Sequence, residues 1–172
     1  KKQAIRDSRI NSTQLLAKSL ISIDNPPKTW LSASAVGWYG DRGDTWLDED
    51  AGPGKGFLAG VCKEWEEATK PAANAGIRVA NLRFSVVLSA DGGAFKTMMT
   101  AFKLGAGGII GNGKQYISWI TLDDAVRAII QALKDPNVNG PVNIASPNPV
   151  TNRELTKALG AALHRPTVFP MP

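Results

Sequence analysis

Apolar residues recur along the chain at two alternating spacings, one typical of helices and the other of buried strands. Five stretches place apolar residues three or four positions apart, which predicts amphipathic helices. The predicted helices cover residues 2–22, 56–75, 91–104, 121–134 and 151–163. Between them lie short runs rich in β-branched and apolar residues, which predict strands. The predicted strands cover residues 28–35, 77–88, 115–120 and 142–145.

This alternation predicts an α/β fold with a doubly wound, mainly parallel sheet that helices cover on both faces. The run 77–88 is nearly continuous in apolar residues, as expected of a strand buried on both faces. About three strands have the character of central strands, and such a small sheet would leave an apolar edge uncovered. We therefore expect further strands upstream of Lys1, which is not an initiator methionine.

The first predicted strand ends in small and hydroxyl residues, and Gly37 and Gly40 mark the exit from it. Open parallel sheets bind ligands beyond the carboxyl ends of their strands, so Ser32 or Ser34 is placed to touch a ligand. A strand end that needs small residues for close packing explains the same pattern equally well. Spacing alone does not separate the two interpretations.

A long loop follows over residues 37–54, with five glycines, one proline and five acids. In a compact domain such a loop often serves as a lid or a binding loop, and a disordered crossing is the alternative. Its carboxylates are candidates for acid–base chemistry, although a solvated acidic loop explains them too. These acids are Asp41, Asp44, Asp48, Glu49 and Asp50.

Composition excludes several classes of protein. The chain has 172 residues, of which 43% are hydrophobic and 20% charged, as in one soluble domain or a large part of one. No apolar run approaches the roughly 20 residues that span a bilayer, so we expect no membrane partner. The net charge of +5 comes from scattered basic residues, which does not favour nucleic-acid binding. The single cysteine excludes an internal disulfide and a cysteine metal cluster, and it fits a reducing, cytoplasmic location.

Three local patterns predict turns and caps rather than chemistry. The glycine-rich run 105–113 is not followed by Gly-Lys-Ser/Thr, so we interpret it as a flexible turn and not as a phosphate loop. The segments 121–124 and 151–154 each have the form of a capping box that starts a helix. His164, the only histidine, lies at a predicted helix end, where it suits the helix dipole.

A set of short motifs, each weak alone, occurs in an order and spacing that is specific when taken together. They include Asp7–Ile10, Ser32–Gly40, Cys62–Glu66, Leu82–Arg83, Val86–Leu88, Gly111–Gln115, Ser118–Ile120, Asp123–Asp124, Pro141–Asn143 and Pro149–Asn152. On these motifs the chain resembles the extended and atypical short-chain dehydrogenase/reductase superfamily, in its epimerase/dehydratase-like part. It is most similar to the branch labelled nucleoside-diphosphate-sugar epimerase, some members of which are labelled cell-division-inhibitor-like.

The resemblance implies the C-terminal part of a Rossmann-type sheet with part of a smaller substrate-side lobe. Relatives begin with a strand, a Gly-x-x-Gly-x-x-Gly turn and a helix that hold a dinucleotide pyrophosphate, and this sequence has no such turn. The Rossmann-like part covers about residues 1–90 and 122–146, and the lobe covers about 91–121 and 147–172. Relatives commonly dimerise through the helices that match 2–22 and 56–75, which implies a homodimer.

The resemblance also implies a catalytic group of serine, tyrosine and lysine, in which tyrosine is the acid/base. Ser34 fits the serine position. Alignment on Trp65-Glu66 places Leu58 at the tyrosine position and Cys62 at the lysine position, and neither can do that work. We interpret Cys62 as a small packing residue. Tyr39 is an alternative proton donor, unless it is a packed aromatic residue.

For the cofactor, the resemblance implies NADP or NAD, with NADP slightly preferred by analogy. The residues expected beside the cofactor are Ala33, Ser34, Phe84, Ser85 and Val86. Gln115 and Trp119 are expected to line the substrate side, with core packing as the alternative for Trp119. We expect Arg83 to point away from the cofactor into a structural ion pair, and we expect no metal.

Two functional hypotheses follow. The first is an NAD(P)-binding oxidoreductase or epimerase-like protein that acts on a small molecule, such as a nucleotide sugar. The second is a dinucleotide-binding regulatory or scaffold protein without catalysis, which the absence of the tyrosine and lysine favours. A third reading is that the segment has no activity of its own because the phosphate-binding half is absent.

Overall fold

The computed structural model describes residues 1–167, so the last five residues of the predicted lobe lie outside the described part of the chain. The chain divides into two compact units. The first unit comprises Lys1–Phe84 and Val126–Ile144, and the second comprises Ser85–Ala125 and the residues from Ala145 onward. Each unit is described by itself below.

The first unit is built on a three-stranded parallel sheet in the order β1-β2-β6. Its strands are β1 (Thr29–Ala35), β2 (Arg78–Phe84) and β6 (Gly140–Ile144). Residues 79 to 83 of the central strand β2 are all buried, as predicted for a strand covered on both faces. The predicted parallel sheet with three central strands is therefore confirmed.

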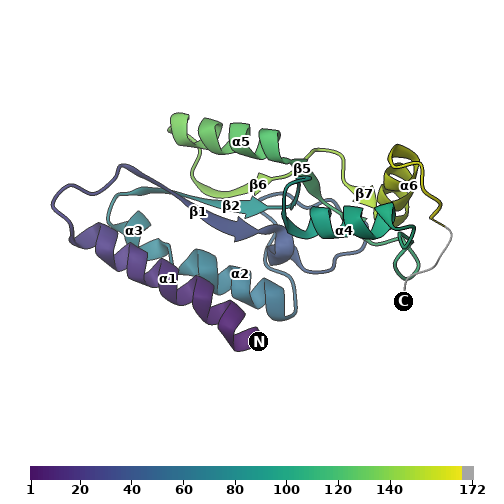
Figure 1. Cartoon of the computed structure of the whole chain (residues 1–172). Coiled ribbons are helices and arrows are strands. Elements are labelled where there is room, and N and C mark those ends of the chain that lie inside the picture. Colours follow the sequence, from purple (N-terminus) through teal and green to yellow (C-terminus); the bar gives the residue numbers. More distant parts are fainter. Residues whose placement is uncertain (168–172) are drawn as a thin grey trace. The chain divides into compact units, whose positions relative to one another are not determined.

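Helices cover both faces of this sheet (Figure 1). On one face lie α1 (Lys2–Ser22), α2 (Phe57–Glu67) and α3 (Lys70–Asn74). The part of α5 (Leu122–Lys134) that belongs to this unit lies on the opposite face. Because parallel strands are joined by crossover helices, this arrangement is the predicted doubly wound fold.

Small residues allow the helices to approach the sheet closely. Ala17 of α1 and Ala72 of α3 are completely buried, and they form one cluster with Ile77 and Val79. Trp30 of β1 packs against the same cluster. Within the predicted helix 2–22, Ala17 thus reaches the core and Leu20 packs against the same cluster, whereas Leu15 and Leu16 stay exposed.

Two predicted elements are interrupted. The helix expected over 56–75 is two helices, because the Thr69 hydroxyl donates back to the Glu66 carbonyl oxygen at 2.7 Å and Pro71 has no N–H to donate. The strand expected over 77–88 is also two strands. After Phe84 pairs with Ile144 the chain leaves that sheet, and β3 (Val86–Leu88) pairs with another strand.

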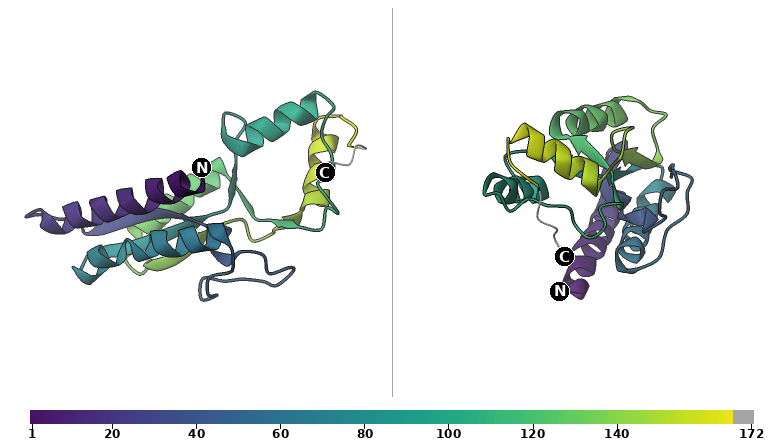
Figure 2. Two further views of the ribbon diagram at one scale, coloured as in Figure 1. Left: turned by 90° about the horizontal axis from the view of Figure 1, so that it is seen from below. Right: turned by 90° about the vertical axis from the view of Figure 1, so that its right-hand side faces the viewer.

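The second unit holds two small two-stranded sheets. In one of them β3 pairs in parallel with β5 (Trp119–Thr121), and in the other β4 (Tyr116–Ile117) pairs antiparallel with β7 (Val150–Thr151). The predicted strand 115–120 is therefore β4 and β5, and β7 was not predicted. The helices of this unit are α4 (Gly93–Lys103) and α6 (Asn152–Ala162), and Figure 2 shows both from two further directions.

The glycine-rich run 105–113 is held by side chains from the start of α6, although the sequence predicted a flexible turn. The buried Asn152 amide oxygen accepts the N–H of Ile110 at 2.8 Å, and the Arg153 guanidinium donates to the Asn112 carbonyl oxygen at 3.0 Å. A side chain at Gly107 would collide with the ring of Phe102, so only glycine fits there. Polar side-chain contacts therefore order a segment with little apolar burial of its own.

The apolar face predicted for the helix that starts at Thr121 is only partly packed. Ala125 and Ala132 are buried, whereas Val126, Ile130 and Leu133 are about half exposed, at 46%, 45% and 55%. The helix itself is confirmed, and its branched apolar residues stay partly exposed in this structure. Small residues face the protein because they permit the closest approach.

Both predicted helix caps are confirmed. The Thr121 hydroxyl accepts the N–H of Asp124 at 3.1 Å. Thr151 and Glu154 form a reciprocal capping box, in which the Thr151 hydroxyl accepts the Glu154 N–H and the Glu154 carboxylate accepts the Thr151 N–H at 2.7 Å. Within residues 1–167, no helix has the length and apolar character needed to cross a membrane.

The cap of α6 makes stability depend on pH. Hydrogen bonds from the Thr151 N–H and hydroxyl lower the pKa of Glu154. A lowered pKa in the folded state means that this stabilisation is present at neutral pH and is lost as the pH falls through that pKa. We expect Glu154→Gln to lower Tm at about pH 7 and to match the unsubstituted chain at about pH 3, in thermal unfolding at both pH values. Glu67→Gln, at an exposed site on α2, is the control and should change little at either pH; an equal Glu154→Gln deficit at both would contradict the assignment.

Candidate active site

A row of three polar residues crosses the carboxyl end of the sheet in the first unit. Ser34 of β1 pairs with Arg83 of β2, which in turn pairs with Asn143 of β6. Residues paired across parallel strands point to the same face, so the three side chains lie on one face of the sheet. Val79 of β2 is four residues before Arg83 and packs with α1 and α3, so this is the face that α1, α2 and α3 cover.

Arg83 is the centre of this row, and only 1% of its surface is exposed. Its Nε donates to Glu66 Oε1 at 2.9 Å and its Nη2 donates to Glu66 Oε2 at 3.0 Å, which makes the pair bidentate. The guanidinium also lies 4.0 Å from the ring centre of Trp38. Burial by itself would lower the pKa of Arg83, but the hydrogen bonds with Glu66 and Tyr39 outweigh it and raise that pKa. The expected structural ion pair of Arg83 is therefore present, with Glu66 as its partner.

The Ser34 hydroxyl belongs to the same cluster. Its Oγ donates to Glu66 Oε1 at 2.6 Å, and the residue is 3% exposed. Its proton is therefore directed at a carboxylate inside the protein. The oxygen of Ser34 keeps its lone pairs, so toward a ligand this hydroxyl could act only as an acceptor while the bond to Glu66 stands.

Tyr39 is also tied into the cluster. Its hydroxyl accepts from Arg83 Nη1 at 3.0 Å and donates to the Asn143 side-chain oxygen at 2.7 Å. Tyr39 is 6% exposed, so the proposed alternative proton donor is a packed aromatic residue whose hydroxyl has two protein partners. Together Ser34, Tyr39, Glu66, Arg83 and Asn143 form what we call the Arg83 network.

The positions that the family resemblance assigned to tyrosine and lysine lie respectively two turns and one turn before Glu66 on the same stripe of α2. Leu58 is 60% exposed and Cys62 is 5% exposed. Gly37, and not Ser34, faces them: a Cβ at Gly37 would lie 3.6 Å from Cys62 Sγ and 3.7 Å from Leu58 Cβ. Burial and the nearby charge of Glu66 raise the pKa of the Cys62 thiol, which disfavours the thiolate form. This part of the edge therefore offers no acid or base from α2.

The predicted cofactor-side residues fall in both units. In the first, Ala33 is exposed and Phe84 is half-buried at the ends of β1 and β2. In the second, Ser85 is buried, and the N–H of Val86 donates to the Ser118 carbonyl oxygen at 3.1 Å.

The predicted substrate-side residues both lie in the second unit. The Trp119 indole N–H donates to the Asn148 carbonyl oxygen at 3.0 Å, and the Gln115 amide donates to the Ile110 carbonyl oxygen at 3.0 Å. These contacts fix the two side chains on their own unit, so the assignment of both to a substrate remains a prediction.

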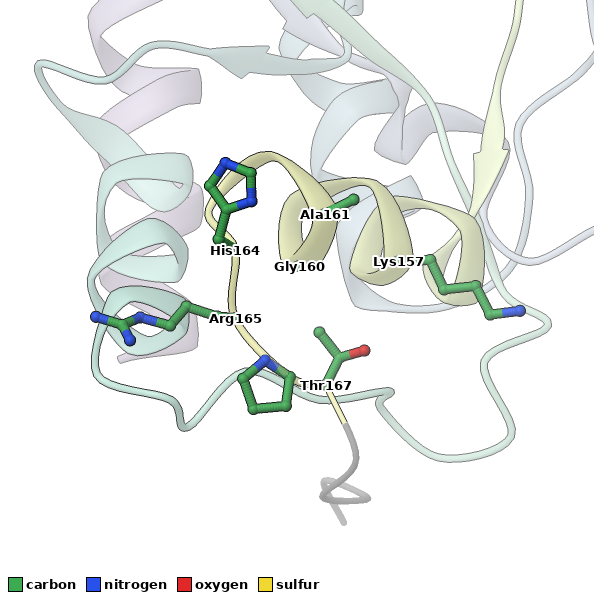
Figure 3. A pocket seen from close by; sticks show the side chains of 7 residues that line it. Lys157, Gly160, Ala161, His164, Arg165 and Thr167 are labelled. Carbon is green, nitrogen blue, oxygen red and sulfur yellow. The ribbon is translucent and has the colours of Figure 1, made fainter.

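A hollow of about 380 Å³ lies at the C-terminal end of α6, and it carries three basic residues. In Figure 3 the side chains of Lys157, His164 and Arg165 point in different directions rather than toward one position. His164 adopts a left-handed backbone conformation, with φ of 52°, where the chain turns out of the helix. The hollow therefore has basic surroundings without a convergent set of ligands. Among the described residues, no group of three or more potential ligands could hold a metal.

Sequence reasoning did not assign a role to Glu66 or Asn143, which are part of the Arg83 network. It named Glu49 only as one of five candidate acids of the loop and not as a contact of Arg83 and Asn143. Glu66 and Asn143 lie inside motifs that carried the family resemblance, Cys62–Glu66 and Pro141–Asn143. A signal was therefore present, but it indicated the family and not the contact.

Comparison with known proteins identifies the family to which this chain belongs. Residues 3–145 match the family described as the NAD dependent epimerase/dehydratase family. The chain belongs to this family. Its relatives include an epimerase family protein of Mycobacterium bovis, 47% identical over 171 residues, which cover 99% of this chain and 56% of that protein. The chain thus spans about half the length of the curated relatives that it matches.

Solved structures agree with the assignment to the epimerase/dehydratase family. The human epimerase family protein SDR39U1, determined with NADPH, superposes on 99% of this chain and 58% of its own, with a TM-score of 0.93 and 34% identity. A nucleoside-diphosphate sugar epimerase from Corynebacterium glutamicum has a TM-score of 0.85 and 43% identity, over 99% of this chain and 38% of that one. The fold, the family and its NAD(P) chemistry thus agree with the resemblance seen in the sequence.

The buried ion pair between Arg83 and Glu66 leads to a quantitative prediction for the free energy of unfolding. Glu66→Ala leaves the Arg83 guanidinium buried without its carboxylate, which should lower the free energy of unfolding by about 3–5 kcal/mol. Replacing both residues, as Glu66→Leu with Arg83→Met, should recover much of this loss because no buried charge remains. Chemical denaturation of both variants measures the difference.

The matched control is Glu64→Ala, on the same helix, where Glu64 pairs with Arg6 and the two side chains are only partly buried, at 39% and 42% exposure. Exposed ion pairs contribute little, so this variant should stay close to the unsubstituted chain. An equal loss in the Glu64 and Glu66 variants would show that the effect is one of helix composition and not of the buried pair.

Proposed function

We propose that this chain is part of an NAD(P)-binding oxidoreductase or epimerase-like enzyme that acts on a small molecule of the nucleotide-sugar class. The observation that carries the proposal is the match to the epimerase/dehydratase family together with the close fit to a human relative determined with NADPH. NADP and NAD are both compatible with it. The chain is about half as long as its relatives, so the activity belongs to a whole protein and is not assigned to this segment alone.

In this proposal the carboxyl ends of β1 and β2 contact the cofactor, as open α/β sheets contact their ligands. The residues there suit a flat ring: Ala33 is small and exposed, and Phe84 is half-buried. The nicotinamide supplies hydride transfer when bound. Ser34 accepts a hydrogen bond from a substrate hydroxyl while its own hydroxyl donates to Glu66. The proton donor is unassigned, because Tyr39 has both of its hydrogen bonds within the Arg83 network.

A second candidate function is dinucleotide binding without catalysis, in a regulatory or scaffold protein. The observation that favours it concerns the side chains at the carboxyl edge of the sheet in the first unit. Leu58 and Cys62 stand where an acid/base pair was expected, and the hydroxyls of Ser34 and Tyr39 are both bound by protein groups. A protein of this kind would keep the cofactor site and lose the proton transfer.

The two candidates make different predictions for Ser34→Ala. For a catalytic Ser34, NADPH affinity should stay the same while turnover of UDP-glucose falls by about tenfold or more, since positioned hydrogen-bonding groups contribute at least this much. Without catalysis, binding persists and cellular activity does not depend on Ser34. NADPH is titrated by its fluorescence in a sample whose intact mass is recorded.

Ser32→Ala is the control for this measurement, because Ser32 lies two residues earlier on the same strand and face and is also buried. A sample at 18.3 kDa that shows no saturable NADPH binding would mean that this chain does not form a cofactor site by itself.

We also propose that the protein is a homodimer through α1 and α2 and that it works in the cytoplasm. Apolar side chains of α1 that the first unit leaves exposed support the dimer, with Leu15 at 68% and Leu16 at 45% exposure. The single free cysteine supports the location, since reducing compartments keep thiols unpaired. Scattered charge supports the absence of a nucleic-acid partner.

The dimer is tested by light scattering after size exclusion. Leu15→Glu should shift the mass from dimer to monomer, because it places a charge in an apolar interface. Leu133→Glu, at an exposed site on α5, is the control and should leave the mass unchanged. A monomer before any substitution would contradict this part of the proposal.

A further inference from the structure

The long acidic loop has a shape of its own. It runs over residues 40–56, between the short 3-10 helix η1 (Val36–Tyr39) and the start of α2, and we call it the 40–56 loop. Figure 2 shows it projecting from the end of β1 beside α2. The Gly54 N–H donates to the Trp38 carbonyl oxygen at 2.8 Å, and the Trp38 indole donates to the Ala51 carbonyl oxygen at 2.9 Å. The two ends of the loop are therefore closed on each other.

Further contacts within the loop keep this shape. The Arg42 guanidinium donates across the loop to the Gly52 carbonyl oxygen at 3.1 Å. A side chain at Gly54 would collide with the carbonyl oxygen of Tyr39, so the two ends touch backbone to backbone. Compact surface loops whose ends lie close together are frequently functional.

One residue of the loop fastens it to the two far strands of the sheet. The Glu49 carboxylate accepts the backbone N–H of Asn143 on β6 at 2.7 Å. The Glu49 carbonyl oxygen accepts from Arg83 Nη1, on β2, at 3.2 Å. Because the loop itself starts from β1, it crosses the carboxyl ends of all three strands.

The other acids of the loop do not turn inward. Asp41, Asp44, Asp48 and Asp50 are exposed, whereas Glu49 is half-buried. Trp46, between them, is 77% exposed, so the middle of the loop buries little apolar surface. A segment with few buried contacts opens at low cost once its fastening is released.

We propose that Glu49 is the latch of the 40–56 loop, and that its release opens the loop as a lid over the edge of the sheet where a dinucleotide binds. The part about the dinucleotide rests on the proposed function. The part about the latch rests on the contacts of Glu49 alone. The ion pair between Arg83 and Glu66 stays intact when the latch opens, because its two hydrogen bonds do not involve the loop.

The latch is tested by hydrogen exchange of the peptides that cover residues 41–52 and by the rate of tryptic cleavage after Arg42. Glu49→Ala should speed both by about tenfold, since it removes one charge-assisted hydrogen bond. Glu49→Gln keeps an oxygen that can accept the Asn143 N–H and should restore most of the protection. Asp44→Ala, which removes an exposed acid of the same loop, is the matched control and should behave like the unsubstituted chain.

A merely structural role would produce a different result. Exchange in β2 should stay slow in Glu49→Ala if Glu49 is a latch, and it should rise together with the loop if the substitution unfolds the first unit. Unchanged exchange of residues 41–52 in Glu49→Ala, or an equal rise in loop and strand, would overturn the proposal.

The lid is tested separately by NADPH titration of the same variants. Glu49→Ala should raise the Kd for NADPH several-fold, and Glu49→Gln should bring it back toward its original value. An unchanged Kd with a freed loop would overturn the lid and leave the latch standing. If the unsubstituted chain does not bind NADPH, it forms no dinucleotide site by itself and the proposed lid fails with that site, while the exchange experiment still decides whether Glu49 is a latch.

Discussion

A buried guanidinium is the constraint on which the first unit depends. Arg83 lies in the central strand with almost no contact with water, and an unpaired charge there would be very costly. Glu66 meets this need from α2 with two parallel hydrogen bonds, so the helix is placed on the sheet by charge as well as by apolar contact. The remaining donor of Arg83 reaches Tyr39 and the 40–56 loop. The strand β2, the helix α2 and the 40–56 loop are thus all connected through the side chain of Arg83.

The same constraint limits the chemistry available at this edge of the sheet. Glu66 pairs with Arg83 and also accepts a hydrogen bond from Ser34, and the Tyr39 hydroxyl lies between Arg83 and Asn143. The hydroxyls of Ser34 and Tyr39, which the sequence offered for contact with a substrate and for proton donation, therefore have partners within the protein in this structure.

In both units, a hydrogen bond between a polar side chain and a backbone N–H holds a loop in place. Glu49 binds the 40–56 loop to the sheet, and Asn152 binds the glycine-rich run through the N–H of Ile110. Loops with many glycines bury little apolar area, so hydrogen bonds to buried backbone groups decide whether they are ordered. Glycine composition alone therefore did not reveal the side-chain contacts that the run 105–113 receives from the start of α6.

Local signals in the sequence determined the helices, the caps at Thr121 and Thr151, the parallel sheet and the buried central strand, because spacing and capping act between near neighbours. They also indicated an ion pair for Arg83. The partner of Arg83 is 17 residues away, and Asn143 lies 60 residues further on, so only the register of β1, β2 and β6 brought these residues together. The break at Ser85 and the use of alanines as the packed face of α5 were likewise decided by tertiary contacts, whereas the break at Thr69 has a local cause in the bond from Thr69 to Glu66. Pairing across strands and packing against neighbours are non-local, and no single stretch of sequence carries them.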